Sequence, residues 1–572
     1  MSDRKRGRIV IVGGVAAGAS AAAKARRTNE TAEIVLFEGG PYTSFANCGL
    51  PYYVGGEIAS RDALFVAEPA QFIERFLIDL RLNTHVVGVD PADRLVTFVD
   101  PTGARGTLSY DRLILATGTV PIVPPIPGIE SPNVFLCRTV PDVDAITERL
   151  KNLAHGHALV FGGGYIGIES AEQLLRRSFQ VTVVEMQDQL MGPLDSEMAQ
   201  PVHTAMESAG VTVILSDGVA RIETIAGRAK AVLTSGRELE FDIAIIGTGV
   251  RPNVELAKAA GIKLGTTGAI AVDPHQRTSD LAIFAAGDNC EAVFLPTGSS
   301  VNIPLAGPAN KQGRIAGQNA ALDLADPDAP PATRLTMGGV LGTAIVRFGD
   351  VVAGATGLTE KQAKRLGIDP LITFVSGLNH ADYYPGAVSM LLKLLFDKDS
   401  GKLLGAQAVG GPGVDKRLDV LATALHGGMA AEDLEQLDLC YAPPFGSAKD
   451  VVIMGGFISA NAHRGTSPGL SPVALLQELS DAPPPFLLDV RSSSEFEAGR
   501  LATATNIPLP ELRGRLADVP TNRRVVVNCA TGLRSYVAQQ ILLNNGWSDV
   551  RNLYGGYRLA SRIRDEHKIQ PR

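Results

Sequence analysis

Cys48 is the first residue of this 572-residue chain whose surroundings suggest chemistry. It lies within residues 44–51, downstream of a glycine-rich opening, and the nearby positions that could hold a partner cysteine are occupied by Thr43 and Tyr53. A lone redox thiolate would have to store oxidising equivalents as a mixed disulfide, a persulfide or a sulfenic acid. The alternative, a buried structural cysteine, fits the specific flanking sequence less well.

A second cysteine, Cys529, lies between a predicted strand at 523–528 and a predicted helix at 536–544. Backbone N–H groups and the helix dipole at such a junction stabilise a thiolate. Arg534 adds a positive charge. The loop between Cys529 and Arg534 is shorter than the phosphate-binding loop of cysteine phosphatases, so it suits a persulfide sulfur better than a phosphate.

The elements around Cys48 predict a dinucleotide-binding unit. A β-branched strand at 8–12 leads into a glycine-rich turn and an alanine-rich helix, although Val15 stands where the full pattern has its middle glycine. A pyrophosphate could bind at the helix N-terminus, and a carboxylate after the next strand could bind a ribose. The residues assigned to this site are Gly13, Ala16, Ala17, Gly18 and Glu38.

Two later strands support this prediction. The strand at 113–118 ends in Thr117 and Gly118, and the strand at 283–288 ends in Gly287 and Asp288. In flavoproteins with two dinucleotide sites, such a Gly-Asp pair places a carboxylate near the ribityl chain of the flavin. FAD is therefore the first expected cofactor.

A complete second fingerprint lies inside the first. The strand 158–161, the loop 162–167, a helix at 168–177, the strand 181–184 and Glu185 follow in the order that a nucleotide site requires. Glu185 can accept hydrogen bonds from both ribose hydroxyls and would repel a 2′-phosphate, which favours NADH and leaves NADPH as the second choice. The residues assigned to this site are Gly162, Gly164, Tyr165, Ile166, Gly167, Glu185 and Gly249.

Composition narrows the possible partners and location. A net charge of -7 argues against a nucleic-acid partner. Five cysteines are too few for a disulfide framework, which predicts a cytoplasmic protein. The apolar N-terminus could pass for a signal peptide, but it fits a strand and helix better, and no window is long enough for a membrane span. The histidines and cysteines lack metal-ligand spacing, so no metal is expected.

With these residues identified, a family resemblance can be stated. Residues 8 to about 455 resemble the single-cysteine pyridine nucleotide-disulfide reductases, and specifically the coenzyme A-disulfide reductases, in the motifs at 13–18, 44–51, 162–167 and 287–288. Residues 473–570 resemble a rhodanese domain in the motifs at 489–491 and 529–535. Together they resemble the coenzyme A-disulfide reductase/rhodanese fusions, also called NADH-dependent persulfide reductases.

The resemblance implies an architecture. The expected fold class is α/β, with two nested Rossmann-like dinucleotide-binding domains, an α+β dimerisation domain and a C-terminal α/β rhodanese domain. The expected domains are an FAD-binding domain (1–119 and 280–325), an NAD(P)H-binding domain (120–279), the dimerisation domain (330–460), a linker (461–472) and the rhodanese domain (473–572).

The resemblance also implies roles for single residues. Cys48 is the redox nucleophile facing the flavin, and Cys529 carries sulfane sulfur, held by loop N–H groups and Arg534. Tyr383 and Tyr441, which composition alone would assign to packing, match paired tyrosines that cover the redox cysteine from the partner subunit, which implies a homodimer. Residues expected to contact coenzyme A are Ser20, Lys24, Arg27, Ser44, Asn47, Arg75, Asn310 and, from the partner chain, Lys449.

The implied activity is the FAD-dependent reduction of coenzyme A disulfide, persulfide or polysulfide by NAD(P)H, with release of coenzyme A and sulfide. Two alternatives stay open: an NADH oxidase or peroxidase that cycles a sulfenic acid, and a redox sensor or sulfur carrier that passes persulfide to a protein. The rhodanese fusion and the Lys24/Arg27 pair disfavour the oxidase. One departure is Arg500, which stands where rhodanese domains commonly have histidine.

Overall fold

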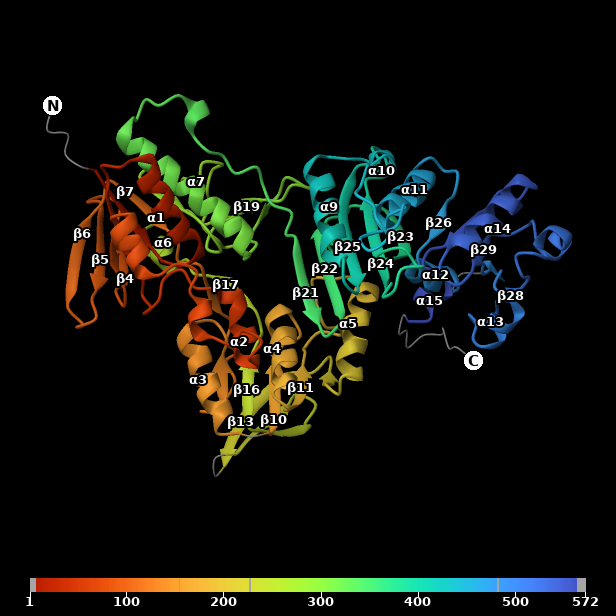
Figure 1. The fold of residues 1–572 in the computed structure, drawn as a ribbon, viewed down its shortest axis with the longest axis horizontal. Helices are drawn as coiled ribbons and strands as arrows, with labels where there is room; N and C mark the ends of the chain where they lie inside the picture. Colours follow the sequence, from red (N-terminus) through yellow and green to blue (C-terminus); the bar gives the residue numbers. More distant parts are fainter. Residues whose placement is uncertain (1–6, 154, 226–227, 481–482, 563–572) are drawn as a thin grey trace. The chain divides into compact units, whose positions relative to one another are not determined.

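The computed structural model describes residues 7–153, 155–225, 228–480 and 483–562 (Figure 1). The chain forms two compact units, one of residues 1–186 and 217–342 and one of residues 187–216 and 343–572. Both combine sheets with covering helices, which confirms the expected mixed α/β class. Among the described helices, none combines the length and apolarity that crossing a membrane would require.

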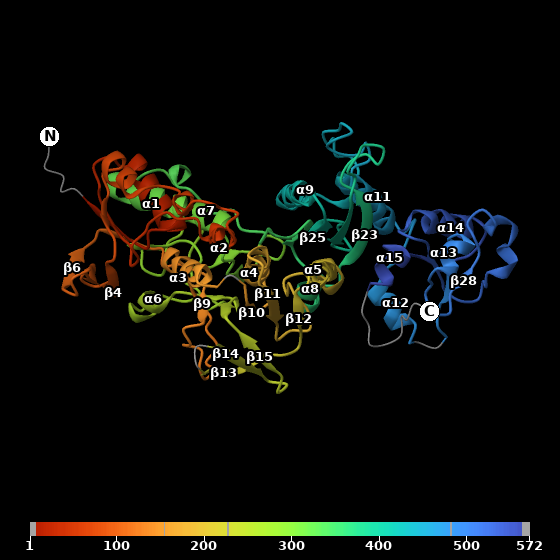
Figure 2. The same cartoon turned by 60° about the horizontal axis from the view of Figure 1, so that its bottom comes forward.

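The N-terminal sheet of the first unit is parallel. Its strands are, in spatial order, β18 (Ile283–Ala285), β7 (Arg112–Leu115), β1 (Arg8–Val12), β2 (Glu33–Phe37) and β3 (Asp79–Arg81). Helices α1 (Ala16–Thr28) and α7 (Ala306–Ala325) lie side by side (Figures 1 and 2). Gly313 and Gly317 permit this close packing, because a Cβ at either would lie 2.2 or 2.3 Å from a carbonyl oxygen of α1.

A second parallel sheet in this unit follows the same plan. Its strands are, in order, β11 (Gln180–Val184), β10 (His157–Phe161), β16 (Ile243–Ile246) and β9 (Val134–Leu136). Helix α4 (Tyr165–Arg176) follows the glycine turn after β10 and begins earlier than the expected Ile168, because Gly164 already acts as its N-cap. A Cβ at Gly167 would lie 2.0 Å from the carbonyl oxygen of Gly162, so only glycine lets helix and strand pack so closely.

Smaller elements complete the first unit. They are α2 (Leu50–Gly55), β4 (His85–Asp90), β5 (Leu95–Val99), β6 (Arg105–Ser109), β8 (Thr119–Pro121), α3 (Val140–Lys151), β13 (Val219–Ile225), β14 (Arg228–Leu233), β15 (Glu238–Phe241), β17 (Val250–Pro252), α6 (Glu255–Ala259), β19 (Ala292–Val293) and β20 (Ser300–Val301).

An antiparallel sheet forms the centre of the second unit. Its strands are, in order, β21 (Ala344–Phe348), β22 (Val351–Gly357), β25 (Leu403–Gly410), β24 (Ser389–Phe396) and β23 (Leu371–Leu378). The helices of this part are α5 (Ser196–Ser208), α8 (Glu360–Arg365), α9 (Val414–His426), α10 (Ala431–Leu434) and α11 (Val451–His463), and the short strand β12 (Thr212–Ile214) follows α5. The buried ammonium of Lys393 binds Asp195 at 2.9 Å and also Glu197 and Glu360, so it compensates these carboxylates.

The C-terminal part of the second unit is a parallel sheet with helices. Its strands are, in order, β26 (Gly469–Leu470), β30 (Val550–Leu553), β29 (Val525–Asn528), β27 (Phe486–Asp489) and β28 (Thr505–Asn506). Its helices are α12 (Pro472–Glu478), α13 (Ser493–Glu497), α14 (Leu533–Asn544) and α15 (Gly556–Ala560). Of residues 461–472, expected to form a linker, 461–463 end α11 and 469–470 form β26.

Candidate active site

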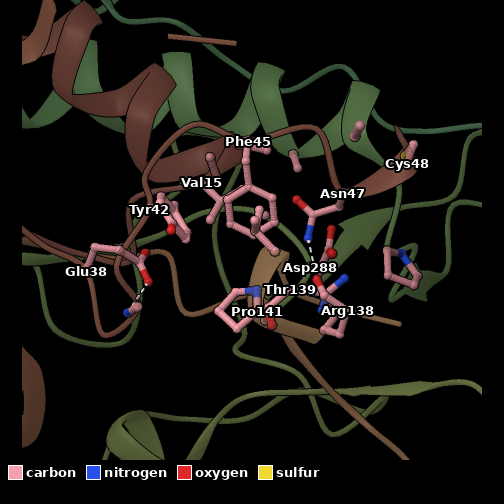
Figure 3. A pocket seen from close by; sticks show the side chains of 18 of the residues that line it. Val15, Glu38, Tyr42, Phe45, Asn47, Cys48, Arg138, Thr139, Pro141 and Asp288 are labelled. Carbon is pink, nitrogen blue, oxygen red and sulfur yellow. Dashed lines mark hydrogen bonds between the residues drawn. The ribbon is translucent and has the colours of Figure 1, made fainter. Parts of the chain in front are cut away.

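A cavity of about 350 Å³ lies at the N-terminus of α1 (Figure 3). The expected site residues that line it are Ala16, Ala17, Glu38, Asn47, Cys48, Gly287 and Asp288. They come from segments far apart in sequence, because the carboxyl ends of the parallel strands β1, β2 and β18 meet at this edge of the sheet. The structure thus brings the first fingerprint, the redox cysteine and the Gly-Asp pair to one cavity.

The glycine turn before α1 has the properties of a phosphate site. Gly13 has φ +102°, and a Cβ there would lie 2.2 Å from the carbonyl oxygen of Ala116. A Cβ at Gly18 would lie 1.7 Å from the carbonyl oxygen of Gly13. Val15, at the N-cap position, leaves the first N–H groups of α1 without a side-chain cap, and no acidic residue lies in the first turn. An uncapped helix N-terminus beside a cavity is suited to a pyrophosphate, so this cradle fits FAD.

Glu38 and Glu185 hold equivalent positions in the two fingerprints. Glu38 accepts hydrogen bonds from the backbone N–H of Gly14 at 2.7 Å and of Gly40 at 2.8 Å. Burial raises the pKa of Glu38, and these backbone N–H groups oppose the rise. Glu185 accepts from the N–H of Gly163 at 2.7 Å. Each carboxylate is therefore fixed beside its glycine loop, where a ribose would be recognised.

The remaining nucleotide-site residues shape the strand ends and the second loop. Thr117 donates a hydrogen bond to the carbonyl oxygen of Asn253 at 2.6 Å. Gly118 and Gly249 both have positive φ, +63° and +100°, and neither lines the cavity beside Cys48. In the second fingerprint, Gly162 makes the turn with φ +97°, and Tyr165 and Ile166 begin α4, whose N-terminus also lacks a side-chain cap.

Cys48 lies on a 3-10 turn, Asn47–Gly49, with an exposed side chain. Desolvation by the surrounding protein raises the pKa of its thiol, and the carboxylates of Glu169 and Asp288 raise it further. Arg138 opposes this rise. The side chains around Cys48 therefore favour the thiol over the thiolate, and its activation requires a further stabilising group.

Arg138 and Glu169 were not expected from the sequence. The Arg138 guanidinium donates a hydrogen bond to Thr119 Oγ1 at 2.8 Å. The backbone carbonyl oxygen of Arg138 accepts one from the side-chain nitrogen of Asn47 at 3.4 Å. Glu169, on α4, accepts a hydrogen bond from the Tyr52 hydroxyl at 3.0 Å. Neither residue belongs to a motif, so only the fold could show that both influence Cys48.

A larger cavity, of about 690 Å³, shares Cys48 with the first. The residues expected to contact coenzyme A that line it are Ser20, Arg27, Ser44, Asn47 and Asn310. Lys311 and Arg314 of α7 also line it and were missed, because α7 reaches this place only through its packing on α1. Lys24 and Arg75 lie outside the lining. Burial lowers the pKa of Lys24, and the charges of Arg314 and Arg27 lower it further, so the cluster would gain from a bound anion.

Tyr383 and Tyr441, in the second unit, meet through their hydroxyl groups at 2.9 Å. This hydrogen bond raises the pKa of Tyr383. Tyr383 and Tyr441 are 71% and 49% exposed, and Tyr384 and Phe445 are exposed as well. Exposed aromatic side chains of this kind are typical of an interaction surface, so composition alone was wrong to assign the pair to packing.

Cys529 lies at the start of the loop between β29 and α14 and is 1% exposed. Its sulfur accepts hydrogen bonds from the backbone N–H of Gly532 at 3.1 Å and the hydroxyl of Ser535 at 3.4 Å. Helix α14 begins at Leu533, earlier than the expected Tyr536, so its N-terminus lies within this loop. The guanidinium of Arg534 forms a two-bond ion pair with Glu495. Arg500, which stands where rhodanese domains commonly have histidine, stacks on Phe496, with 5.1 Å from its Cζ to the ring centroid.

The fold and these sites agree with a known family. A family model described as pyridine nucleotide-disulphide oxidoreductase matches residues 7–313, more than half of the chain. The chain belongs to this family. The dimerisation domain of the pyridine nucleotide-disulphide oxidoreductases matches residues 343–451, and a rhodanese-like domain matches residues 472–561.

Similar proteins match all or most of the chain. The crystal structure described as reduced Bacillus anthracis CoADR-RHD is 40% identical, with a TM-score of 0.93, and the match covers 100% of both chains. The NAD(P)H coenzyme A polysulfide/persulfide reductase of Pyrococcus horikoshii is 35% identical over 79% of this chain and 98% of its own. An NADH oxidase of Methanocaldococcus jannaschii is 36% identical over 76% of this chain and 95% of its own.

Proposed function

We propose that this oxidoreductase uses NADH and FAD to reduce coenzyme A disulfides and persulfides at Cys48, while Cys529 carries sulfane sulfur. One observation supports this most strongly: Cys48 is shared by two cavities of different character. One adjoins the uncapped N-terminus of α1, and the other is lined by Arg27, Lys311 and Arg314. A thiol between a nucleotide cradle and a cationic cavity suits a reductase of a phosphorylated thiol compound.

Bound FAD would supply the two-electron connection between NADH and Cys48. The chain itself supplies the nucleophile. The Cys48 thiolate attacks coenzyme A disulfide, one coenzyme A leaves as a thiolate, and a Cys48–coenzyme A mixed disulfide remains. With coenzyme A persulfide, attack on the terminal sulfur leaves a Cys48 persulfide and coenzyme A thiolate. Reduction by two electrons then yields coenzyme A in the first case and sulfide in the second.

The cations of the larger cavity give the substrate its orientation. Arg27, Lys311 and Arg314 would bind phosphate groups of coenzyme A. Ser20, Ser44, Asn47 and Asn310 offer hydrogen bonds along the path to Cys48.

We further propose that the protein acts as a homodimer in which Tyr383 and Tyr441 cover Cys48 of a second copy. The exposed tyrosine pair and the match to a dimerisation domain support this assembly. A tyrosine hydroxyl there could donate a proton to the departing coenzyme A thiolate. Lys449 would reach the coenzyme A phosphates of that second copy.

Anaerobic NADH oxidation by the purified protein tests the proposal, with coenzyme A persulfide, coenzyme A disulfide and hydrogen peroxide as acceptors. We expect fast turnover of the coenzyme A compounds, loss of this turnover in Cys48→Ser and its retention in Cys529→Ser. Fast peroxide turnover with little activity toward the sulfur compounds would instead establish an oxidase or peroxidase. The Methanocaldococcus jannaschii relative is named as an NADH oxidase. Slow turnover with every acceptor would favour a sulfur carrier.

A further inference from the structure

The second unit contains a cavity of about 320 Å³ beside the Cys529 loop. Thr531, Gly532 and Leu533 of the loop form part of its wall. The N–H of Gly532 also donates to the Cys529 sulfur at 3.1 Å, so the cavity adjoins the peptide group that holds the thiol. Of the residues proposed above for the reductase chemistry at Cys48, only Lys449 lines this cavity.

Tyr536, Asn552, Tyr554 and Gly555 of the rhodanese domain also line the cavity, and much of the remaining wall comes from outside that domain. Strand β23 and helix α11, which precede the rhodanese-like match, supply Phe374, Val375, Ser376, Met454, Phe457, Ile458 and Asn461. Most of these side chains are apolar. A rhodanese domain by itself would leave this side of its loop open, so the dimerisation domain gives the Cys529 loop an apolar wall that a substrate must contact.

The connection between the two domains is anchored. Helix α11 ends at His463, and the following segment is fastened to α14 by Gln539. Ser467 donates a hydrogen bond to the Gln539 side-chain oxygen at 2.6 Å, and the Gln539 side-chain nitrogen donates to the carbonyl oxygen of Pro468 at 2.6 Å. Residues 469–470 then pair with β30. The apolar wall is therefore held beside the loop by a short, hydrogen-bonded connection.

Two lining residues, Asn552 and Tyr554, each have a buried side-chain oxygen without a hydrogen-bond partner among the described residues. Asn552 is 6% exposed, and its Oδ1 has no hydrogen-bond partner among the described residues, although its Nδ2 donates to the carbonyl oxygen of Gly532 at 3.3 Å. A buried acceptor without a donor is costly, which points to a ligand or solvent group in this cavity. Lys449 supplies the only cation of this lining.

We propose that this cavity binds the organic arm of the sulfane-sulfur donor of Cys529, and that α11 makes the rhodanese reaction selective for donors with an apolar arm. This inference rests on the sulfur-carrying role proposed above for Cys529. A negatively charged sulfur group would lie toward the loop N–H groups, and the carbon chain would contact Phe457, Met454 and Leu533. Organic thiosulfonates and persulfides have this shape, whereas thiosulfate has no carbon arm.

The sulfur transfer balances without a further reactant. The Cys529 thiolate attacks the terminal sulfur of a thiosulfonate R–SO₂–S⁻, the sulfur–sulfur bond breaks, and the sulfinate R–SO₂⁻ leaves with the bonding electron pair. Cys529 then holds a persulfide. Cyanide removes its outer sulfur as thiocyanate and restores the thiolate. With an organic persulfide, the leaving group is the thiolate R–S⁻.

The test measures thiocyanate formation by the full FAD-loaded chain with methane-, butane- and hexanethiosulfonate as donors. These donors share one reacting group, so they differ only in the carbon arm. Because each buried methylene favours binding, we expect kcat/KM to rise by at least about tenfold from methane- to hexanethiosulfonate. The rate in Cys529→Ser is subtracted, so that only transfer through Cys529 is counted.

Two variants, which differ in how they could disturb folding, test whether the apolar wall causes the selectivity. Phe457→Ala removes apolar wall, and Ser376→Phe narrows the cavity from an exposed position on β23. Both should reduce the advantage of the long arm and leave the methyl donor nearly unchanged. Ile453→Ala, on the same helix but outside the lining, is the matched control. NADH-dependent reduction through Cys48 should stay the same in all three variants.

The outcomes separate this inference from the proposed function. A flat dependence on arm length, or equal losses for every donor in both variants, would overturn the selectivity while leaving the role of Cys529 intact. Absence of thiocyanate with every donor would overturn the selectivity together with the role of Cys529. A preference for thiosulfate over the hexyl donor in the same assay would also contradict the apolar site.

Discussion

Arg534 and Glu495 form an ion pair through two hydrogen bonds, of 2.7 and 2.8 Å, beside Cys529. The hydrogen bonds from Arg534 lower the pKa of Glu495 to about 2. Cys529 is among the groups that raise the pKa of Arg534, so the guanidinium interacts with both partners. Glu495 therefore compensates much of the positive charge that the sequence alone would assign to the Cys529 loop.

Glu495→Gln should make Cys529 more reactive. The substitution keeps a hydrogen-bonding group beside Arg534 but removes the compensating charge, so the cation acts more fully on the thiolate. We expect iodoacetamide to alkylate Cys529 roughly threefold faster at neutral pH, measured by peptide mass spectrometry. Glu497→Gln, an exposed position on the same helix, is the control. Slower alkylation in Glu495→Gln would show that Glu495 mainly positions Arg534.

Glu169→Gln should shift the titration of Cys48 to lower pH. Desolvation is the main cause of the raised pKa of this thiol, and the charge of Glu169 is the second. Removing that charge favours the thiolate, so inactivation by iodoacetamide should reach half of its maximal rate at a lower pH in the holoenzyme. Burial also raises the pKa of Glu169, so the difference should appear only where Glu169 is ionised.

The exposed variant Glu68→Gln provides the comparison for this pH profile. It should leave the inactivation of the enzyme unchanged, because Glu68 does not contribute to the pKa of Cys48. An unchanged profile in Glu169→Gln, or a shift to higher pH, would contradict the electrostatic account of the Cys48 site.

Much of the nucleotide chemistry was predictable because it is local in sequence. The turn at Gly13–Gly18 and the acids Glu38 and Glu185 occur at fixed spacings after strands, and the structure places them beside their loops. Val15 shows why an imperfect motif could still be correct: the positions that need glycine for space are Gly13 and Gly18.

The residues that were missed come from packing between distant segments. Arg314 and Lys311 reach the larger cavity beside Cys48 because α7 packs on α1, and Arg138, two residues after β9, reaches the smaller one. No local pattern marks these cations. No local pattern marks Glu495 either, because its pairing with Arg534 depends on how α13 packs beside the Cys529 loop.

Arg314→Ala should weaken the binding of coenzyme A compounds. Because the substitution removes the binding free energy of a charge-assisted contact to phosphate, KM for coenzyme A disulfide should rise about tenfold, with kcat nearly unchanged. Steady-state NADH oxidation measures both parameters. Arg513→Ala, an exposed arginine in the rhodanese domain, is the control. An unchanged KM, or a loss confined to kcat, would show that the phosphate groups do not bind at α7.

Glu185→Ser should reduce the preference for NADH over NADPH. The carboxylate that accepts from Gly163 is placed to bind ribose hydroxyls and to repel a 2′-phosphate. We expect the ratio of kcat/KM for NADH to that for NADPH to fall by about tenfold or more, with FAD content unchanged. Asp188→Asn, a nearby carboxylate outside the fingerprint, should keep the ratio. Equal use of both nucleotides by the wild type would contradict the role of Glu185.

The most direct test of the central claim is intact-protein mass spectrometry after anaerobic incubation of the FAD-loaded protein, with Cys48 first reduced to the free thiol and the reductant removed, with coenzyme A disulfide. The account predicts one coenzyme A attached per chain through a disulfide to Cys48, released by NADH, absent from Cys48→Ser and retained in Cys529→Ser. Attachment only at Cys529, or a Cys48 that takes up oxygen from peroxide but never coenzyme A, would contradict the claim that Cys48 reduces coenzyme A disulfides and persulfides.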